Sequence, residues 1–388
     1  MKRREFFRMF VWIISVAFLF CIDGDRGAYA ESDNLIVSVM TRNMDAGTDL
    51  QYVVGAQTVD EFVAGVINTI AEVEASNIPE RAAQLAAEIA AVNPELIALQ
   101  EVTTWKINDV TYDQLELLMA ALENAGMHYR IAALQTLADL PVEIPDLLSV
   151  RFTDYNAILV RTDLPPGHLM IIGTETHLYE NYLQFDVPDG PTIPVLNGWM
   201  AVDVKIRGAR FKFANTHLLT AVPGDLFEAT EQIQLAQAAE LMAGLSASSL
   251  PIILAGDFNS DAEVPQNFPD QTETAALIAS SGYLDVWHFK FPEERGYTWP
   301  LFLEDQPPPD FTVPSTPFER IDLIFSKGPV PLLVELTGTE KGSEGVYASD
   351  HVGVVARFSL ENHRPDVPRG KSSGKSNGNQ RQSKRKTP

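Results

Sequence analysis

Short apolar runs bounded by turn residues recur along the chain and predict buried β-strands. The clearest runs cover residues 35–41, 95–100, 156–160, 251–255 and 321–326. Because these runs are mostly continuous rather than alternating, we expect both faces of the strands to be covered. Residues 201–206 alternate instead and lead through Arg207-Gly208 into residues 210–213. That pattern predicts a half-exposed hairpin.

Amphipathic helical patterns lie between the predicted strands. They cover residues 79–92, 113–124 and 225–245, and Pro79 stands near a helix start. The alternation of strands and helices shows no repeat of about 20 to 50 residues, which argues against a solenoid and predicts an α/β chain with mixed sheets. Proline-dense stretches are interpreted as loops; they lie at 140–145, 188–194 and 306–317. No long linker precedes Asn362, so we expect one folded domain over residues 31–360.

The first thirty residues have the pattern of an export signal. Four basic residues among the first eight precede an apolar run over 9–22, and Ala28-Tyr29-Ala30 offers small residues for cleavage. The run is shorter than the roughly 20 residues that a bilayer span needs, so we interpret residues 1–30 as a signal peptide rather than a membrane anchor. Arg3-Arg4 fits a twin-arginine signal, and the apolar run fits the general secretory route equally well. We expect a secreted or periplasmic mature chain without cysteine, because Cys21 lies within the signal.

The net charge of −23 is unevenly distributed. Residues 361–388 hold eight Lys and Arg against two Asp and Glu, and they are rich in Ser, Gly, Asn and Gln. We therefore expect a disordered basic tail. The remaining chain is still more acidic than the whole, so it should repel polyanions. A small or lipid-linked substrate is therefore more natural than extended nucleic acid.

The strongest local signal is Ala255-Gly256-Asp257-Phe258-Asn259 at the end of an apolar strand. Residues i and i+2 of an extended strand share a face, so Asp257 and Asn259 would point together beyond the strand. Gly256 would allow a close approach of the backbone. An Asp/Asn-rich turn explains the same residues equally well when they are taken alone.

Two further segments place ionisable side chains on predicted strands. Ser349-Asp350-His351 precedes the apolar segment 352–356. Adjacent residues of a strand point in different directions, so Asp350 and His351 suit different tasks, one holding a metal while the other handles a proton. Asp322 lies inside an apolar strand, where a buried carboxylate needs a partner such as a histidine.

Single polar residues follow three more predicted strands, namely Asn43, Glu101 and His217. Each residue alone could be a solvated strand end. Their recurrence favours a shared site.

In chain order, six segments carry a family resemblance. They are Asn43, Leu99-Gln100-Glu101, Asn215-Thr216-His217-Leu218, Gly256-Asp257-Phe258-Asn259, Arg320-Ile321-Asp322 and Ser349-Asp350-His351. Together they resemble the endonuclease/exonuclease/phosphatase superfamily, which has the DNase I-like fold, over about residues 34–360. The resemblance implies a four-layer α/β sandwich, in which two packed mixed β-sheets are flanked by helices.

The same resemblance implies a metal site. Asn43 and Glu101 would help to hold a divalent ion, with Asp350 as a further ligand or water-mediated contact. Oxygen ligands fit Mg²⁺ best, with Mn²⁺ or Ca²⁺ as alternatives. Asp45 is an additional candidate ligand, although residues 45–49 could equally form a turn.

The resemblance also implies the catalytic roles. His351, oriented by Asp322, would be the general base for the attacking water. Asp257 and Asn259 would position the nucleophile and the phosphoryl oxygens, and His217 would stabilise the phosphate or protonate the leaving oxygen. These groups suit in-line attack, which builds negative charge on the phosphoryl oxygens and the leaving group.

The sequence departs from the better-known branches of the superfamily. His217 stands where the abasic-site endonuclease branch carries a tyrosine, which argues against DNA repair. Residues 46–76 and 172–199 have no obvious counterpart in those enzymes. We expect both segments to shape the substrate site.

These observations predict an exported, divalent-metal-dependent phosphodiesterase or phosphatase that hydrolyses a small or lipid-linked phosphoester. One alternative is a secreted nuclease, since the basic tail could recruit nucleic acid. Another is a binding protein that kept the fold but lost catalysis, against which the intact pair His217 and His351 argues. The tail could also contact an anionic polymer or a membrane surface, and we expect a monomer.

Overall fold

The computed structural model describes residues 35–263, 272–302, 311 and 314–361. The described residues from Leu35 onward belong to one compact unit. The expected signal peptide, nearly all of the expected tail and much of the expected loop at 306–317 lie outside the described residues. Within the described ranges, no helix combines the length and the apolar character needed to cross a membrane.

A seven-stranded mixed sheet is built around two parallel strands, β1 and β2. Its order is β14 (Val330–Thr337), β15 (Gly353–Ser359), β1 (Ile36–Asn43), β2 (Leu96–Ile107), β5 (Leu148–Arg161) and β4 (Tyr129–Ile144), with β3 (Val110–Asp113) paired to β2. The other neighbours in this sheet are antiparallel. Because β1 and β2 are parallel, polar residues at the C-terminal ends of both strands lie at the same edge.

A six-stranded mixed sheet contains the second parallel pair, β10 and β11. Its order is β12 (Leu284–Asp285), β13 (Asp322–Lys327), β11 (Ile252–Asp257), β10 (Ala209–His217), β9 (Gly198–Ile206) and β6 (Leu169–Leu178). A separate two-stranded sheet is formed by β7 (Leu183–Asp186) and β8 (Thr192–Val195).

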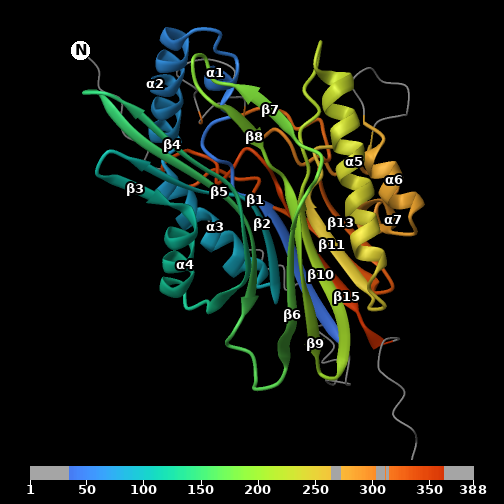
Figure 1. The fold of residues 1–388 in the computed structure, drawn as a ribbon. Coiled ribbons are helices and arrows are strands. Elements are labelled where there is room, and N and C mark those ends of the chain that lie inside the picture. Colours follow the sequence, from blue (N-terminus) through green and yellow to red (C-terminus); the bar gives the residue numbers. More distant parts are fainter. Residues whose placement is uncertain (1–34, 264–271, 303–310, 312–313, 362–388) are drawn as a thin grey trace, which may run out of the picture. The chain divides into compact units, whose positions relative to one another are not determined.

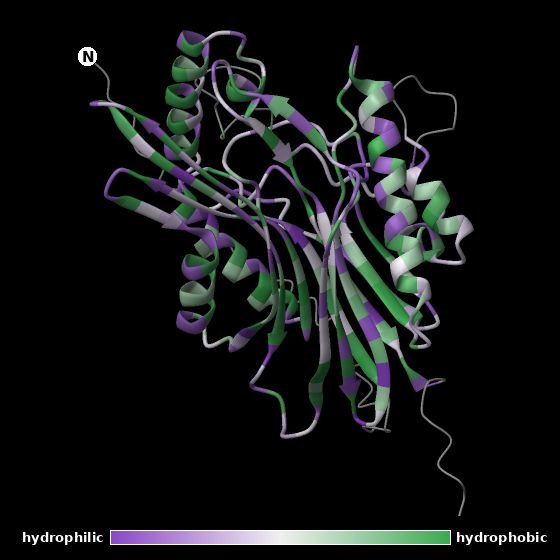
Figure 2. Cartoon of the chain, viewed as in Figure 1, coloured by the Kyte–Doolittle hydropathy of each residue, from purple (hydrophilic) through white to green (hydrophobic). Residues whose placement is uncertain are grey.

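The main core lies between the two large sheets. It includes Val39 of β1, Ile158 of β5, Val202 of β9, Phe213 of β10 and Ile253 of β11, all of them buried. In Figure 2 the central strands carry green apolar stretches that are interrupted by purple polar positions. The two inner faces therefore exclude water and hold the sheets together.

Helices cover the outer faces of both sheets (Figure 1). α3 (Ile78–Val92) and α4 (Gln114–Asn124) pack on β1, β2 and β5. α2 (Val59–Ala75), which follows the short α1 (Gln51–Val54), packs on the far ends of β2 and β5. α5 (Phe227–Ser246) and α6 (Thr274–Ser280) cover the second sheet, and α7 (Val286–Lys290) lies beside them. The predicted four-layer α/β sandwich with two mixed sheets is confirmed.

Most predicted elements are confirmed with shifted ends. The five predicted strands correspond to β1, β2, β5, β11 and β13, and the three predicted helices correspond to α3, α4 and α5. The hairpin at Arg207-Gly208 is also present, and its predicted exposure is confirmed in part: Asp203 and Lys205 are partly exposed and Arg210 is exposed, whereas Lys212 is buried. Residues 140–145 are not a loop as predicted but mostly belong to β4, and β8 occupies part of 188–194. β4 is an edge strand, so Pro141 does not break a ladder on both sides.

The inner face of each central strand changes from apolar to polar at one end of the sandwich. On β1, Val39 lies in the core and is followed on the same face by Thr41 and Asn43. On β11, Ala255 lies in the core and is followed by Asp257. Since successive residues on one face are two positions apart, this change places a set of polar side chains between the ends of the two sheets.

Candidate active site

Three predicted site residues lie side by side at the end of the second sheet. His217 of β10 is the register partner of Asp257 of β11, and Asp257 is in turn the partner of Asp322 on β13. All three side chains are buried or nearly so. The strand ends alone therefore bring together one histidine and two carboxylates that are far apart in the sequence.

Glu101 reaches the same place from the first sheet. The pairing of β2 with β5 shifts register between Leu99 and Val102, and Glu101 itself has a positive φ of 50°. This irregularity turns the Glu101 carboxylate away from an ordinary strand direction. Nε2 of His217 lies 3.9 Å from Oε1 of Glu101 and 3.7 Å from Oδ2 of Asp257.

Asn43 links the two sheets. Its Nδ2 donates to Oε1 of Glu101 at 2.9 Å and to Oδ2 of Asp257 at 2.9 Å. Its Oδ1 accepts from the backbone N–H of Asp45 at 2.8 Å. In this geometry Asn43 joins the two carboxylates through its amide nitrogen. A 180° flip of the side-chain amide would turn its oxygen toward them instead.

His351 is held by a carboxylate, as its sequence context predicts. Nδ1 of His351 lies 2.8 Å from Oδ2 of Asp322, and the two side chains are 6% and 0% exposed. Nε2 lies 3.9 Å from Oδ2 of Asp257 and 3.8 Å from Oδ1 of Asp350. Burial alone would lower the pKa of His351, but the carboxylates of Asp322, Asp350 and Asp257 together raise it well above its usual value. The imidazole is thus fixed at Nδ1 and faces the site with Nε2.

Asn259 lies against His217 by a different route from the one expected. β11 ends at Asp257, and Asn259 follows with a positive φ of 47°, so the two residues are not neighbours on one strand face. Instead, the N–H of Asn259 donates to Oδ1 of Asp257 at 2.9 Å, and its Nδ2 lies 3.2 Å from Nε2 of His217. The turn interpretation is therefore confirmed, and the same turn places Asn259 against His217. Gly256 is required as predicted, since a Cβ there would lie 2.1 Å from the carbonyl of Thr216.

Asp350 and Asp45 lie at the edges of this cluster. Oδ2 of Asp350 accepts from Nε1 of Trp299 at 2.9 Å, and burial raises the pKa of Asp350. Asp45 forms the predicted turn, because its Oδ1 accepts from the N–H of Gly47 at 2.5 Å and its Oδ2 pairs with Arg81 at 3.1 Å. Burial raises the pKa of Asp45 to about 6.

Among the residues that the structure describes, two overlapping groups of side chains could hold a cation. Glu101, His217 and Asp257 form one group and Asp257, Asp322 and His351 the other, with ligand atoms in each group within 4.8 Å of one another. The first group contains Glu101 as predicted, with Asp257 and His217 in place of Asp350. Carboxylate oxygens with one imidazole suit Mg²⁺ or Mn²⁺.

Several polar residues near the site carried no clear sequence signal. Asn215 on β10 accepts from Nε2 of Gln100 at 2.7 Å and so ties the two sheets together beneath the site. Burial, with the charge of Glu101 added, raises the pKa of Asp154 on β5 well above its usual value. Burial also raises the pKa of Glu319 to about 7, with Asp261 and Asp257 adding to the effect. Among these residues, Asn215 and Gln100 could have been identified because they belong to the family motifs, whereas Asp154 and Glu319 lie outside those motifs.

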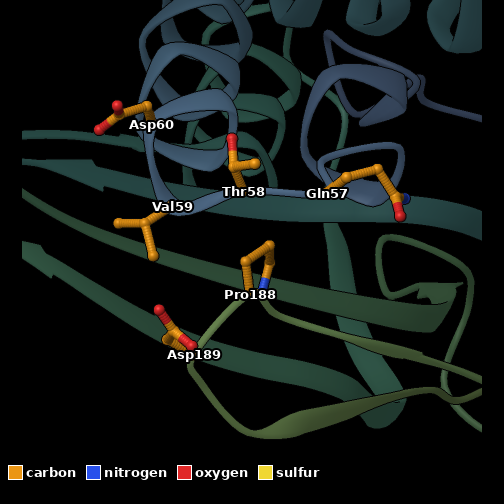
Figure 3. A pocket seen from close by; sticks show the side chains of 6 residues that line it. All are labelled: Gln57, Thr58, Val59, Asp60, Pro188 and Asp189. Atoms are coloured by element: carbon orange, nitrogen blue, oxygen red, sulfur yellow. The ribbon is translucent and has the colours of Figure 1, made fainter.

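A surface pocket of about 370 Å³ lies apart from these residues (Figure 3). It is lined by Gln57, Thr58, Val59, Asp60, Pro188 and Asp189. Those residues belong to the two segments, 46–76 and 172–199, that lack a counterpart in the better-known enzymes. None of the nine predicted site residues lines the pocket, so it is not where the predicted chemistry would occur.

Comparisons with known proteins identify the family and the fold. The family model described as the endonuclease/exonuclease/phosphatase family matches residues 67–351, which include every predicted site residue except Asn43 and Asp45. No curated protein sequence matches the chain.

Solved structures resemble the fold at low sequence identity. TDP2 from D. rerio, complexed with a single strand DNA product, is 17% identical with a TM-score of 0.52, over 84% of this chain and 100% of its own. Family proteins from Bacteroides thetaiotaomicron and Beutenbergia cavernae have TM-scores of 0.51 and 0.50 at 16% and 20% identity. The matches cover 85% and 84% of this chain, and 98% and 72% of those chains. At such identities the likeness shows the fold alone.

Proposed function

Because the chain belongs to the endonuclease/exonuclease/phosphatase family, we propose that it is a divalent-metal-dependent phosphoesterase acting on a small or lipid-linked substrate. The observation that carries this proposal is the convergence of five side chains: Asn43, His217 and His351 each lie within hydrogen-bond or ion-pair distance of Asp257, and Asn43 and His217 also of Glu101. These side chains come from both sheets and from opposite ends of the chain. A merely structural polar cluster would not need two histidines facing the same carboxylate.

The residues fit a hard divalent cation. Glu101 and Asp257 offer carboxylate oxygens, and His217 offers a nitrogen within the same 4.8 Å group. Asn43 and Asp350 would complete the set through an amide oxygen and a direct or water-mediated carboxylate contact. When bound, such an ion supplies positive charge against the phosphoryl oxygens and the leaving group.

The two histidines take opposite roles in the proposed reaction. His351, bound through Nδ1 to Asp322, accepts at Nε2 the proton of the water that attacks phosphorus. It must be neutral to do so, and a bound cation beside Asp257 would favour the neutral form by lowering the raised pKa of the imidazole. Asp257 and Asn259 position that water and the phosphoryl oxygens. His217, which lies between Glu101 and Asn259, stabilises the phosphate or gives a proton to the leaving oxygen.

Charge around the site favours a substrate with few negative charges. Glu101, Asp257 and Asp350 bring carboxylates to the site, whereas burial raises the pKa of nearby Asp154, Glu319 and Asp261 and so favours their neutral forms. Arg81 and Arg320 are buried and paired with carboxylates. A small diester with one negative charge therefore suits the site better than a polyanion.

A secreted nuclease remains the second candidate. The basic composition of residues 361–388 supports it, and the TDP2 structure that shares the fold holds a DNA product. The net charge of −23 argues in the other direction. Both candidates use the same cluster and differ only in substrate.

A substrate screen tests the proposed function. The full chain, stripped with EDTA and resupplied with Mg²⁺, Mn²⁺ or Ca²⁺, is offered bis(4-nitrophenyl) phosphate, 4-nitrophenyl phosphate, sphingomyelin, single-stranded DNA and RNA. We expect metal-dependent hydrolysis of a small or lipid-linked ester, lost in Asp257→Asn and kept in Asp139→Asn, which removes the same charge from an exposed pair with Arg151. Preference for DNA or RNA would select the nuclease, and hydrolysis unaffected by EDTA would contradict the proposal.

We further propose that residues 1–30 direct export and are removed. Their basic start, apolar run and small-residue cleavage position support this. N-terminal sequencing of the protein from a secreting host should begin near Glu31. An intact N-terminus on a cytoplasmic protein would contradict export.

A further inference from the structure

An arginine is fully buried in the strand that leads to the site. Arg42 stands on β1 between Met40 and Met44, whose side chains belong to the apolar cluster under α3 and α4. Its exposed fraction is 0%. Removing a guanidinium from water is unfavourable unless its N–H groups find partners, so the partners of Arg42 indicate its purpose.

Arg42 binds one carboxylate and two backbone carbonyls. Its Nε donates to Oε2 of Glu88 on α3 at 3.2 Å, and the Glu88 side chain is 5% exposed. Its Nη1 donates to the carbonyl of His351 and lies 3.5 Å from the carbonyl of Asn43. One planar group therefore connects α3, the end of β1 and the backbone of the proposed base.

Two glycines make room for this pair. A Cβ at Gly353 would lie 2.5 Å from Oε1 of Glu88 and 3.1 Å from Cδ of Arg42. A Cβ at Gly338 would lie 2.6 Å from Oε2 of Glu88 and 2.8 Å from Nη2 of Arg42. Both glycines flank the segment that carries Asp350 and His351, so that segment is packed directly against the pair.

The side chain of His351 is fixed by Asp322, and Arg42 helps to fix its backbone through the carbonyl. Residues 348–352 form no regular strand ladder, because β15 begins only at Gly353. The N–H of His351 donates to Oγ of Ser349 at 3.0 Å, and the backbones of Asp350 and Val352 bond to neighbouring loop residues, but Arg42 supplies the donor for the His351 carbonyl. A side chain of similar size without N–H groups would fill the space but leave that carbonyl unbound.

From these contacts we infer that Arg42, held by Glu88, is a positioning residue that sets the backbone of the proposed base His351 relative to Asn43. This inference rests on the proposed function, because it assigns the pair to the same reaction. Arg42 faces away from the inner surface of β1 and does not touch substrate. Its effect should therefore fall on turnover and not on substrate binding.

Arg42→Lys is the first test, with the full chain, Mg²⁺ and bis(4-nitrophenyl) phosphate. Lysine keeps the charge but cannot bind Glu88 and two carbonyls in one plane. We expect kcat to fall about a hundredfold, the loss expected from a displacement of about 1 Å, with KM changed less than about twofold. Arg151→Lys is the matched control, because it alters an exposed arginine–carboxylate pair and should leave kcat unchanged.

A double variant separates positioning from stability. The double variant Arg42→Met/Glu88→Met removes both buried charges and leaves neither of them unpaired. Its Tm should therefore lie close to that of the parent, while its kcat stays low. Recovery of kcat in the double variant, or an unchanged kcat in folded Arg42→Lys, would overturn the inference. If neither protein folds, Glu88→Gln decides, with a reduced kcat at constant KM supporting the inference and a parental kcat refuting it. A parent chain that hydrolyses no ester would instead refute the proposed function.

Discussion

The contact between Asp322 and His351 gives the most quantitative prediction for the site. Asp322→Asn keeps the size of the side chain and removes its charge. Nδ1 of His351 and Oδ2 of Asp322 are 2.8 Å apart in a buried environment. In the proposed reaction the imidazole becomes positively charged as it takes the proton from water, so loss of the facing carboxylate destabilises the transition state.

The size of the effect follows from the distance between the charges. Opposite unit charges about 4 Å apart at an effective dielectric constant of about 20 interact by about 4 kcal/mol. At about 1.4 kcal/mol for each tenfold change in rate, kcat should fall by a factor of about 10² to 10³. Asp322 is 1% exposed and does not reach substrate, so KM should change little.

Steady-state kinetics with saturating Mg²⁺ and a chromogenic diester measure both parameters. Asp163→Asn is a suitable control, because Asp163 pairs with Arg161 outside the site. Circular dichroism and thermal melting establish that the variants are folded. A folded Asp322→Asn protein with kcat within threefold of the parent would refute the assignment of His351 as the base.

Two further predictions concern stability. Burial raises the pKa of Glu319 from 4.5 to about 7, so the folded chain holds a proton that the unfolded chain releases, and stability from this group is lost as pH rises between those values. Glu319→Gln should then raise Tm by about 2–4 °C above pH 7 and leave Tm unchanged below pH 4.5. The control variant Glu340→Gln, at an exposed position, should leave Tm unchanged at both pH values. An equal effect of Glu319→Gln at both pH values would contradict this reasoning. Gly256→Ala should lower Tm by about 6 °C or more, because φ is 155° and the new Cβ would lie 2.1 Å from the Thr216 carbonyl. Gly208→Ala, with positive φ but nothing within 4 Å, should cost less, and equal losses would show that the contact is unimportant.

The sequence predicts the site residues best where an apolar strand ends in a polar side chain. Asn43, His217 and Asp257 all follow this pattern, and their strands are parallel neighbours in pairs, so the ends meet at one edge. Asp322 is visible for the opposite reason, as a charge inside an apolar strand. In these cases the local sequence pattern is enough to identify the residue, because a polar side chain interrupts a regular run of apolar residues.

Residues that act through long-range packing could not be found in this way. Arg42 follows an apolar run and resembles a solvated strand end, and only the approach of α3 with Glu88 makes it a buried group. Asp154 lies in a polar stretch of β5, which led to the strand being predicted too short. Glu319 has no periodic signal, and its raised pKa comes first from burial, with Asp261 and Asp257 adding to the effect.

The same reasoning explains the misassigned segment at 140–145. Pro141 argues against a central strand, but β4 lies at the edge of its sheet and pairs only with β5. Sequence pattern alone does not reveal which strand lies at an edge. Sheet order is a property of the whole chain.

The central claim is that the ends of the two sheets hold a divalent cation against Glu101 and Asp257. Anomalous diffraction from crystals of the full chain grown with Mn²⁺ measures this directly. The account predicts a strong manganese peak within about 2.0–2.3 Å of a Glu101 oxygen and beside Asp257, and no such peak in Glu101→Gln. Manganese found only elsewhere on the protein, or an unchanged peak in the variant, would contradict it.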